Sequence, residues 1–154
     1  MGNICTGDKF TGDKFTGDKF TDEFILYIKN GDEEGVRRGC EAGLVNSYSN
    51  GWTDATYAID YEQFHILKIL TEYGVELNMT CYDGHTPLML ACWRENDTVV
   101  KYLIEHGADS SLRNMYGRTA AHDAAAQNNP ECLRLVSVHA EVDIRDHGGN
   151  TPMD

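Results

Sequence analysis

Four glycines at nearly equal spacing constrain the fold of this chain more than any other feature. Gly51, Gly84, Gly117 and Gly149 recur at an almost constant interval, and each of them stands two positions before a threonine. A period of this length, about 33 residues, indicates a supersecondary unit that is repeated along the chain. In such an array each copy buries its apolar face against the next copy.

The pattern of two short helices is clearest in residues 81–113. Thr86 is a good N-cap, and Pro87 suits the first turn of a helix, where its missing amide hydrogen is not needed. A break at 95–97 precedes a second apolar run at helical spacing, which consists of Val99, Val100, Leu103 and Ile104. Gly107 then predicts the left-handed residue that ends this helix.

The chain resembles the ankyrin repeat family in this period and in the segment Asp83-Gly84-His85-Thr86-Pro87-Leu88-Met89-Leu90-Ala91. The resemblance covers residues 21–154 and implies an all-α solenoid of stacked helix-turn-helix units joined by β-turn fingers. We expect a first repeat at 21–47, full repeats at 48–80, 81–113 and 114–145, and a truncated repeat at 146–154. Because residues 150–154 open another helix, we also expect the chain to be a fragment of a longer protein.

Three copies depart from the family pattern. Asp54 and Ala55 stand where the family has proline and leucine. Asp123 occupies the position of Leu90 in the middle copy, and we expect a local distortion there, because a carboxylate on a core face is costly unless it is paired. In the first repeat, Gly39-Cys40 replaces an expected pair of leucines, which predicts a loss of packing and of helix propensity.

Composition excludes several classes of protein. The chain has 25 acidic and 13 basic residues and a formal charge of −12, without a basic cluster, which argues against nucleic acid as a partner. It contains no apolar run of the roughly 20 residues that a membrane-spanning helix needs. The start lacks the apolar segment of a secretory signal, and the five cysteines show neither a metal pair nor a disulfide framework. These features predict a cytoplasmic protein.

The sequence carries no signature of catalysis. It lacks a phosphate-binding glycine loop, a nucleophile elbow and a zinc-binding helix motif. His122 and Asp123 could form an acid/base pair, but the resemblance assigns His122 to bracing the repeat turn by hydrogen bonding. His85, His106 and Cys92 lack the spacing of metal ligands. We therefore expect no enzymatic activity, no cofactor, no metal site and no small-molecule substrate.

The resemblance implies a protein-binding surface on the finger tips and on the first helix of each repeat. Aromatic and arginine side chains, which dominate interface energies, are frequent at these positions. The predicted surface contains Trp52, Tyr61, Tyr82, His85, Trp93, Arg94, Tyr116 and Arg118. The alternative for a single aromatic residue, Trp93 above all, is packing between repeats. The acidic charge favours a protein partner with a basic or mixed surface.

Residues 1–20 form a separate segment. The unit Thr-Gly-Asp-Lys-Phe occurs at 6–10, 11–15 and 16–20, and its single apolar side chain predicts a flexible leader. The start of the chain, Met1 to Thr6, fits the myristoylation pattern, with Gly2 as the acylated residue. One acyl chain holds a protein only weakly, so Cys5 is the candidate for palmitoylation as a second anchor. The alternative for Cys5 is a free thiol.

Together these observations predict a non-catalytic scaffold that binds another protein, held at the cytoplasmic face of a membrane if Gly2 and Cys5 are acylated. The alternative is the N-terminal part of a larger ankyrin-containing enzyme or channel. In that case a segment beyond Asp154 would carry the chemistry. A kinase or transmembrane region in that segment would favour this alternative.

Overall fold

The computed structural model describes residues 19–138 and 140–154, and these residues form eight helices and one short hairpin. Residues 1–18 of the predicted leader lie outside the described residues, whereas Lys19 and Phe20 already belong to the first helix. The elements in chain order are α1 (Lys19–Asn30), α2 (Glu33–Glu41), β1 (Tyr48–Ser49), β2 (Trp52–Thr53), α3 (Asp54–Asp60), α4 (Phe64–Glu72), α5 (Pro87–Trp93), α6 (Asp97–Glu105), α7 (Ala120–Ala126) and α8 (Pro130–Ser137).

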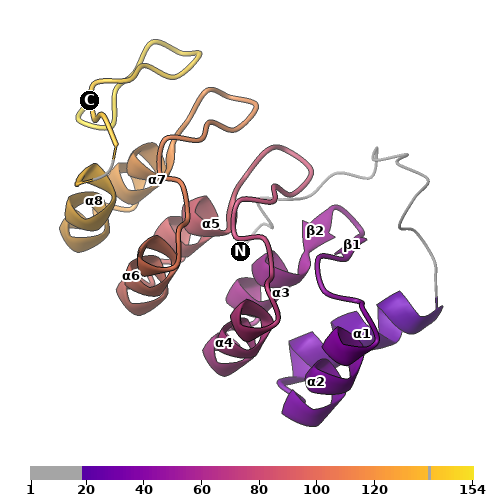
Figure 1. Ribbon diagram of the computed structural model, residues 1–154. Helices are drawn as coiled ribbons and strands as arrows, with labels where there is room; N and C mark the ends of the chain where they lie inside the picture. The colour runs from indigo at the N-terminus through magenta and orange to yellow at the C-terminus, as the bar shows by residue number, and fades with distance from the viewer. Residues whose placement is uncertain (1–18, 139) are drawn as a thin grey trace.

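The helices pair within each repeat and stack in two rows (Figure 1). The inner row contains α1, α3, α5 and α7, each in contact with the next, and the outer row contains α2, α4, α6 and α8. Beyond the inner row the connecting loops project as four fingers, at 48–53, 81–86, 114–119 and 146–151. The predicted all-α solenoid of stacked helix pairs is confirmed.

Side-chain caps explain where the helices begin. The Thr86 hydroxyl accepts a hydrogen bond from the Met89 amide at 3.2 Å, and Pro87 occupies the first turn of α5, as the sequence predicts. The outer helices α6 and α8 follow Asn96 and Asn129, whose side chains accept bonds from backbone amides in the first turn. These caps satisfy donors that have no partner inside the helix.

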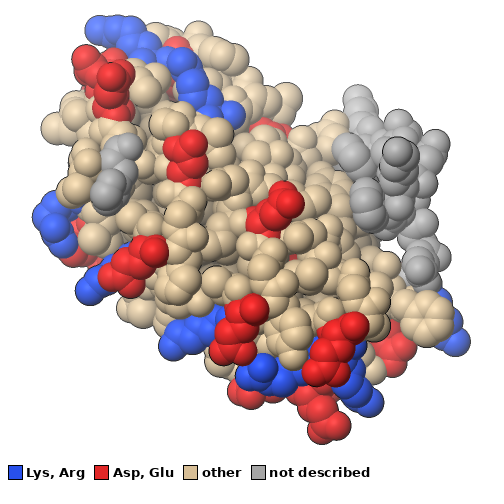
Figure 2. Space-filling view, in the orientation of Figure 1, with Lys and Arg blue, Asp and Glu red and all other residues tan. Residues whose placement is uncertain are grey.

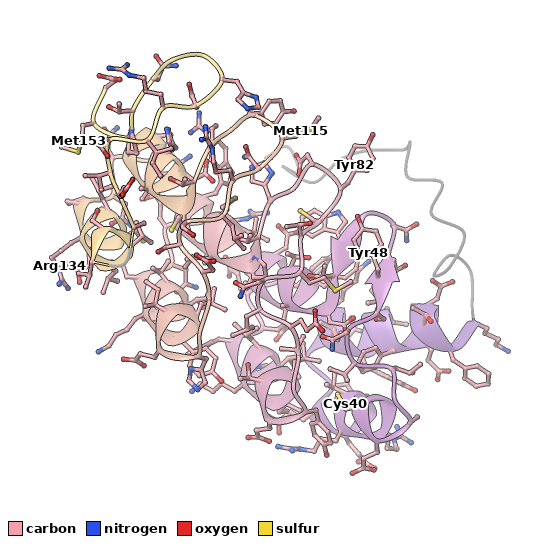
Figure 3. The ribbon with its side chains drawn as sticks, turned by 45° about the horizontal axis from the view of Figure 1, so that its top comes forward. Cys40, Tyr48, Tyr82, Met115, Arg134 and Met153 are labelled. Carbon is pink, nitrogen blue, oxygen red and sulfur yellow. The ribbon has the colours of Figure 1, made fainter. Side chains whose placement is uncertain are left out.

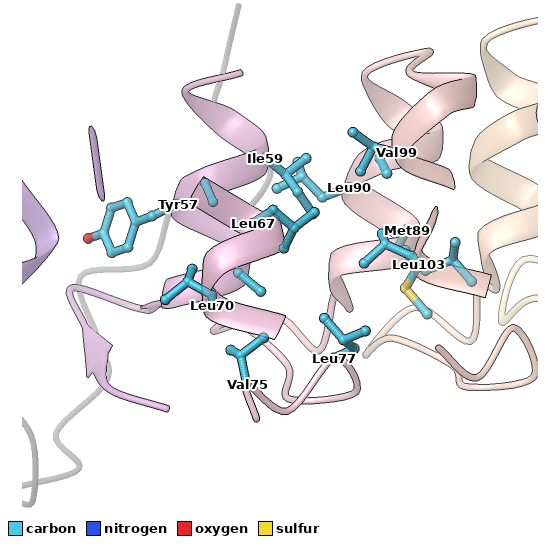
Figure 4. Packing of buried hydrophobic residues seen from close by; sticks show 14 of the residues in the cluster. Tyr57, Ile59, Leu67, Leu70, Val75, Leu77, Met89, Leu90, Val99 and Leu103 are labelled. Carbon is cyan, nitrogen blue, oxygen red and sulfur yellow. The ribbon is translucent and has the colours of Figure 1, made fainter. Parts of the chain in front are cut away.

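The core is one continuous cluster that extends from Phe24 to Val136. Figure 4 shows its central part, where leucines of neighbouring repeats face one another. Leu67 and Leu70 of α4, Leu90 of α5 and Leu103 of α6 have no exposed surface; each buried leucine stabilises the fold by about 1.5–3 kcal/mol. A single helix pair could not cover these side chains, so the repeats depend on their neighbours.

The first repeat replaces its missing leucines with aromatic rings. Phe24 of α1 is only 1% exposed, and a Cβ added at Gly39 would lie 2.2 Å from its Cδ2 atom. One turn earlier on α2, a Cβ added at Gly35 would lie 2.4 Å from Cγ of Tyr27. The predicted loss of packing at Gly39 is therefore wrong, because the bare backbone of this glycine makes room for the ring of Phe24.

Asp54 anchors the base of the first finger. Its side chain accepts a hydrogen bond from the Ser47 amide at 3.0 Å and a second one from the Ser47 hydroxyl. Asp54 has no exposed surface, and this burial raises the pKa of its carboxyl group to about 7, although the bonds from Ser47 favour the ionised form. At the position of the family's proline, Asp54 thus connects the start of α3 to the chain before β1.

We predict that Gly39→Ala destabilises the protein, although alanine is the better helix former by about 1 kcal/mol. The added methyl group would force Phe24 or α2 to move, and overpacking of this kind costs about 1–3 kcal/mol. Urea unfolding would measure the change, with Glu34→Ala on the exposed side of α2 as the control. Combining Gly39→Ala with Phe24→Leu should recover part of the loss. A Gly39→Ala protein at least as stable as the wild type would contradict this packing.

A second prediction concerns the pH dependence of stability. The pKa of Asp54 in the folded state lies above the value of about 3.9 for an exposed aspartate, so the folded state binds the extra proton between these values. The free energy of unfolding should therefore fall as the pH rises toward 7, by up to about 1.4 kcal/mol per pH unit. Asp54→Asn keeps the shape of the side chain and removes its charge. The free energy of unfolding of this variant, relative to that of the wild type, should therefore increase as the pH rises.

The comparison is the difference in unfolding free energy between wild type and Asp54→Asn, measured from pH 5 to pH 8. Other titrating groups cancel in this difference. Asp143→Asn, at an exposed position, is the matched control and should show a constant difference. If the Asp54→Asn difference is equally constant, the folded state does not raise the pKa of the Asp54 carboxyl group, and the prediction is wrong.

Candidate functional site

Main-chain hydrogen bonds join the fingers into one row. An amide near each tip donates to a carbonyl of the preceding finger, Tyr82 to Gly51 at 2.9 Å, Met115 to Asp83 at 3.1 Å and His147 to Tyr116 at 2.9 Å. Figure 3 shows Tyr48, Tyr82 and Met115 along this row, with Arg134 on the opposite, outer side of the array. Side chains from different repeats therefore share one surface.

The third finger presents two large hydrophobic side chains that are exposed. Tyr116 is 53% exposed and Met115 is 57% exposed, whereas Tyr82 on the second finger is half-buried. Tyr82 and Tyr116 were both expected on the binding surface. The apolar side chain of Met115 adds to this surface.

Two residues of the predicted surface are buried instead. Trp52 is 5% exposed and stacks on Tyr57, with 5.7 Å between the ring centroids. His85 is 7% exposed, and its ring nitrogens lie 2.7 Å from the Asp83 carboxylate and 3.1 Å from the Asn114 amide. Trp52 and His85 each follow a finger glycine directly, and their side chains point back toward the helices. They therefore support the fingers and cannot serve as free contacts for a partner.

The ends of the first two full inner helices carry the other predicted residues. Tyr61 is 46% exposed, and the ammonium group of Lys29 from α1 lies 5.3 Å from its ring centroid. Trp93 and Arg94 at the end of α5 are half-buried, and the Arg94 guanidinium forms an ion pair with Asp60 at the end of α3. At the ends of α3 and α5, the surface therefore contains aromatic rings next to charged groups that already have partners within the chain.

Arg118 marks the other end of the surface. Its guanidinium lies 3.3 Å from the Asp123 carboxylate and donates to the carbonyl oxygen of His122 at 3.1 Å. Asp123 lies in the regular helix α7 and is 2% exposed, so the expected local distortion is wrong. The carboxylate is accommodated because Arg118 reaches it from the third finger, although its Oδ2 atom has no hydrogen-bond partner among the described residues.

Lys29 and Asp60 were not predicted to belong to this surface. Lys29 lies against two tyrosine rings, those of Tyr57 at 4.8 Å and Tyr61, and Asp60 holds Arg94. Their positions offered a signal, because Lys29, Asp60 and Trp93 stand nearly one repeat length apart in successive inner helices. Lys29, Arg94 and Arg118 are thus oriented by other groups of the chain itself.

His122 braces the turn, as predicted. Its Nδ1 atom accepts a hydrogen bond from the Thr119 amide at 3.1 Å, so the proton of a neutral ring is on Nε2, which lies 3.0 Å from the Asn150 carbonyl oxygen. The bond to Asn150 connects α7 to the fourth finger. Because both nitrogens are engaged and Asp123 pairs with Arg118, the pair His122 and Asp123 does not form an acid/base site.

Two other kinds of site are absent from residues 19–138 and 140–154. Within these ranges no three or more histidine, cysteine or acidic side chains are grouped to hold a metal ion. None of the helices in the same ranges has the length and apolar character needed to cross a membrane. The candidate acylation residues Gly2 and Cys5 lie outside the described part of the chain.

Comparison with known proteins agrees with this geometry. A family model described as ankyrin repeats (3 copies) matches residues 24–114, and one described as ankyrin repeats (many copies) matches residues 94–136. The chain is 36% identical over 86 residues to the protein fem-1 homolog A-like of Mus musculus, and the match covers 55% of the chain and 13% of the relative.

Two further relatives show the same partial coverage. The chain is 31% identical over 111 residues to BRCA1-associated RING domain protein 1 of Caenorhabditis elegans, with 71% of the chain and 16% of the relative covered. It is 37% identical over 81 residues to Probable E3 ubiquitin-protein ligase XBOS32 of Oryza sativa subsp. japonica, with 52% and 16% covered. With a family model that matches more than half of its length and a solenoid of the same repeating unit, this chain belongs to the ankyrin repeat family.

Proposed function

We propose that this chain is a non-catalytic module that binds another protein across its finger tips and the ends of its inner helices. The observation that carries the proposal is the exposure of Tyr61, Met115 and Tyr116 on elements whose backbone is fixed by neighbours. Rigid, exposed aromatic side chains give large contact area at little entropic cost, and such residues dominate interface energies.

The charge distribution supports a partner with basic or mixed charge. In Figure 2 acidic and basic side chains alternate along the lower left edge, where α2, α4 and α6 lie, and they are sparse over the centre of this view. On the proposed surface Lys29, Arg94 and Arg118 are already held by partners within the chain. The net charge of −12 therefore favours association with a protein that brings its own cations.

Alanine substitution tests the surface once a partner has been captured and identified. Tyr61→Ala and Tyr116→Ala should each weaken binding by about 2 kcal/mol, or roughly thirtyfold, if the residue is an anchor. Tyr82→Ala and Arg94→Ala test the half-buried part of the same surface. Lys101→Ala on the outer helix α6 is the control, because this side chain is exposed away from the fingers. Isothermal calorimetry or surface plasmon resonance would provide the dissociation constants.

The surface is misplaced if the four alanine variants bind like the wild type while the control does too. Circular dichroism must show that each variant keeps its helix content, since Arg94→Ala also leaves Asp60 without its cation. A loss of binding without a loss of structure assigns the contact to the side chain itself.

We propose in addition that the module is held at the cytoplasmic face of a membrane by a myristoyl group on Gly2 and a palmitoyl group on Cys5. The support is the segment Met1-Gly2-Asn3-Ile4-Cys5-Thr6, which fits the myristoylation pattern. Each buried methylene contributes about 0.8 kcal/mol, so two chains anchor a protein stably while one allows exchange.

Fractionation of a eukaryotic cell that expresses the protein tests the anchor. The wild type should be in the membrane fraction, Gly2→Ala should be fully soluble, and Cys5→Ser should divide between both fractions, because it keeps one acyl chain. Intact mass identifies the lipids. A soluble wild-type protein of unmodified mass, in a cell that acylates other substrates, would leave a cytosolic ankyrin module without a membrane anchor.

A second candidate function is that of the recognition region of a larger enzyme. The observation that favours it is the length of the relatives, of which the matched part spans 13–16%, and one of them is named an E3 ubiquitin-protein ligase. The mass of the natural gene product decides between the two proposals. A product that extends well beyond Asp154 and has ligase activity would favour the enzyme.

A further inference from the structure

Asp123 and Arg118 form a buried ion pair with an unusual property. The Asp123 carboxylate is inside the array, with 3% of its side chain exposed, while 31% of the Arg118 side chain is exposed. One carboxylate oxygen faces the guanidinium at 3.3 Å, and the other has no hydrogen-bond partner among the described residues. An ionised carboxylate with an unsatisfied buried oxygen is costly, and binding a proton would relieve this cost.

Charged and titratable groups face Asp123 from the second and third fingers and from α5. The third finger contributes Arg118, the second finger contributes His85 with its partner Asp83, and α5 contributes Cys92. The outer helix α8 brings Cys132 against Cys92. The pKa of the Cys92 thiol is well above its ordinary range, because of its hydrogen bond with Cys132 and its burial, so this thiol stays neutral during mild acidification.

We propose that Asp123 and Arg118 act as a proton-operated latch, which holds Arg118 at neutral pH and releases it to the binding surface when Asp123 is protonated. The proton comes from solvent and binds the carboxylate, after which the ion pair is lost and only the hydrogen bond to the His122 carbonyl oxygen still holds the guanidinium. The array stays folded through this change. Acidification thus frees the Arg118 guanidinium from its buried carboxylate, while Lys29 and Arg94 remain held.

Burial raises the pKa of Asp123 to about 6, against the opposing effect of His85 and Arg118. The protonated fraction of such a group rises from about 3% at pH 7.5 to about 90% at pH 5. Since this pKa lies above that of an exposed aspartate, the folded state binds the proton more tightly than the unfolded state. Acidification from pH 6 toward 4 therefore favours the folded form of this repeat, and release of Arg118 does not require unfolding.

A cavity beside Arg118 can receive the released guanidinium. Arg118 lines a cavity of about 350 Å³ together with Asp146 and Asp154. The pKa values of these two carboxyl groups are lowered by backbone hydrogen bonds, from Asn150 to Asp146 and from Thr151 to Asp154. They stay ionised when Asp123 becomes neutral, so the guanidinium can turn from a buried carboxylate to exposed ones.

The latch is tested by nuclear magnetic resonance on the isolated chain, without any partner. The carboxyl carbon of Asp123 and the Nε–H group of Arg118 are followed from pH 8 to pH 4.5. We expect Asp123 to titrate near pH 6 and the order parameter of the Arg118 side chain to fall with the same midpoint. Asp123→Asn should make Arg118 mobile at every pH, and Asp143→Asn should behave like the wild type.

Three results would overturn the latch. The first is a midpoint for Asp123 below pH 4.5, and the second is an Arg118 side chain that stays ordered throughout. The third is an Arg118 signal that follows the imidazole of His85 in the same spectra instead of Asp123. Should Asp123→Asn not fold, Asp123→Leu replaces it, since Leu90 fills the same position in the preceding repeat.

The contribution of the latch to recognition rests on the proposed function, and a separate measurement addresses it. With an identified partner, the ratio of dissociation constants at pH 7.5 and pH 5.5 is compared between the wild type and Asp123→Leu. A ratio that changes in the wild type and not in the variant assigns the pH effect to the latch. Equal ratios remove the latch from recognition, while a failure of all surface variants to affect binding would remove the proposed surface itself.

Discussion

The apolar contact between neighbouring helix pairs is the constraint on which this structure depends. Leucines such as Leu67 and Leu103 are completely buried only because the adjacent repeat covers them. Each contact spans a boundary between repeats, so the array is held together by a chain of local interfaces. The inner helices therefore sit at a fixed spacing, and this spacing brings the fingers close enough for their main chains to bond.

The features that could be predicted from the sequence are those in which a residue type has a single common structural role. The glycine period, the threonine cap at Thr86 and the brace at His122 each follow from a local geometric requirement, and the structure contains them. The prediction at Gly39 was wrong, because the packing at that glycine depends on its contact with the ring of Phe24 in the preceding helix. Pairings that occur once in a repeat protein leave no repeated signal.

The same limit explains the errors at the candidate site. The residues after the finger glycines were treated alike, yet Trp52 and His85 turn inward while Arg118 stays half-exposed. Burial of Trp52 follows from its stacking on Tyr57, and burial of His85 from its bonds to Asp83 and Asn114. Position within a repeat indicates which element a side chain starts from, whereas its final direction depends on partners that differ between copies. The buried carboxylates of Asp54 and Asp123 likewise pair with Ser47 and Arg118, and these pairings do not recur in the repeat pattern.

The hydrogen bonds that join the finger tips connect backbone atoms, from the Tyr82 amide to the Gly51 carbonyl and from the Met115 amide to the Asp83 carbonyl. Alignment of the row is therefore independent of the identity of the tip side chains. A mutation at Tyr82, Met115 or Tyr116 changes what the surface can recognise without shifting the register of the fingers. Such a separation lets specificity drift during evolution at little risk to the scaffold, and it makes these tips the natural positions at which to randomise residues in a library.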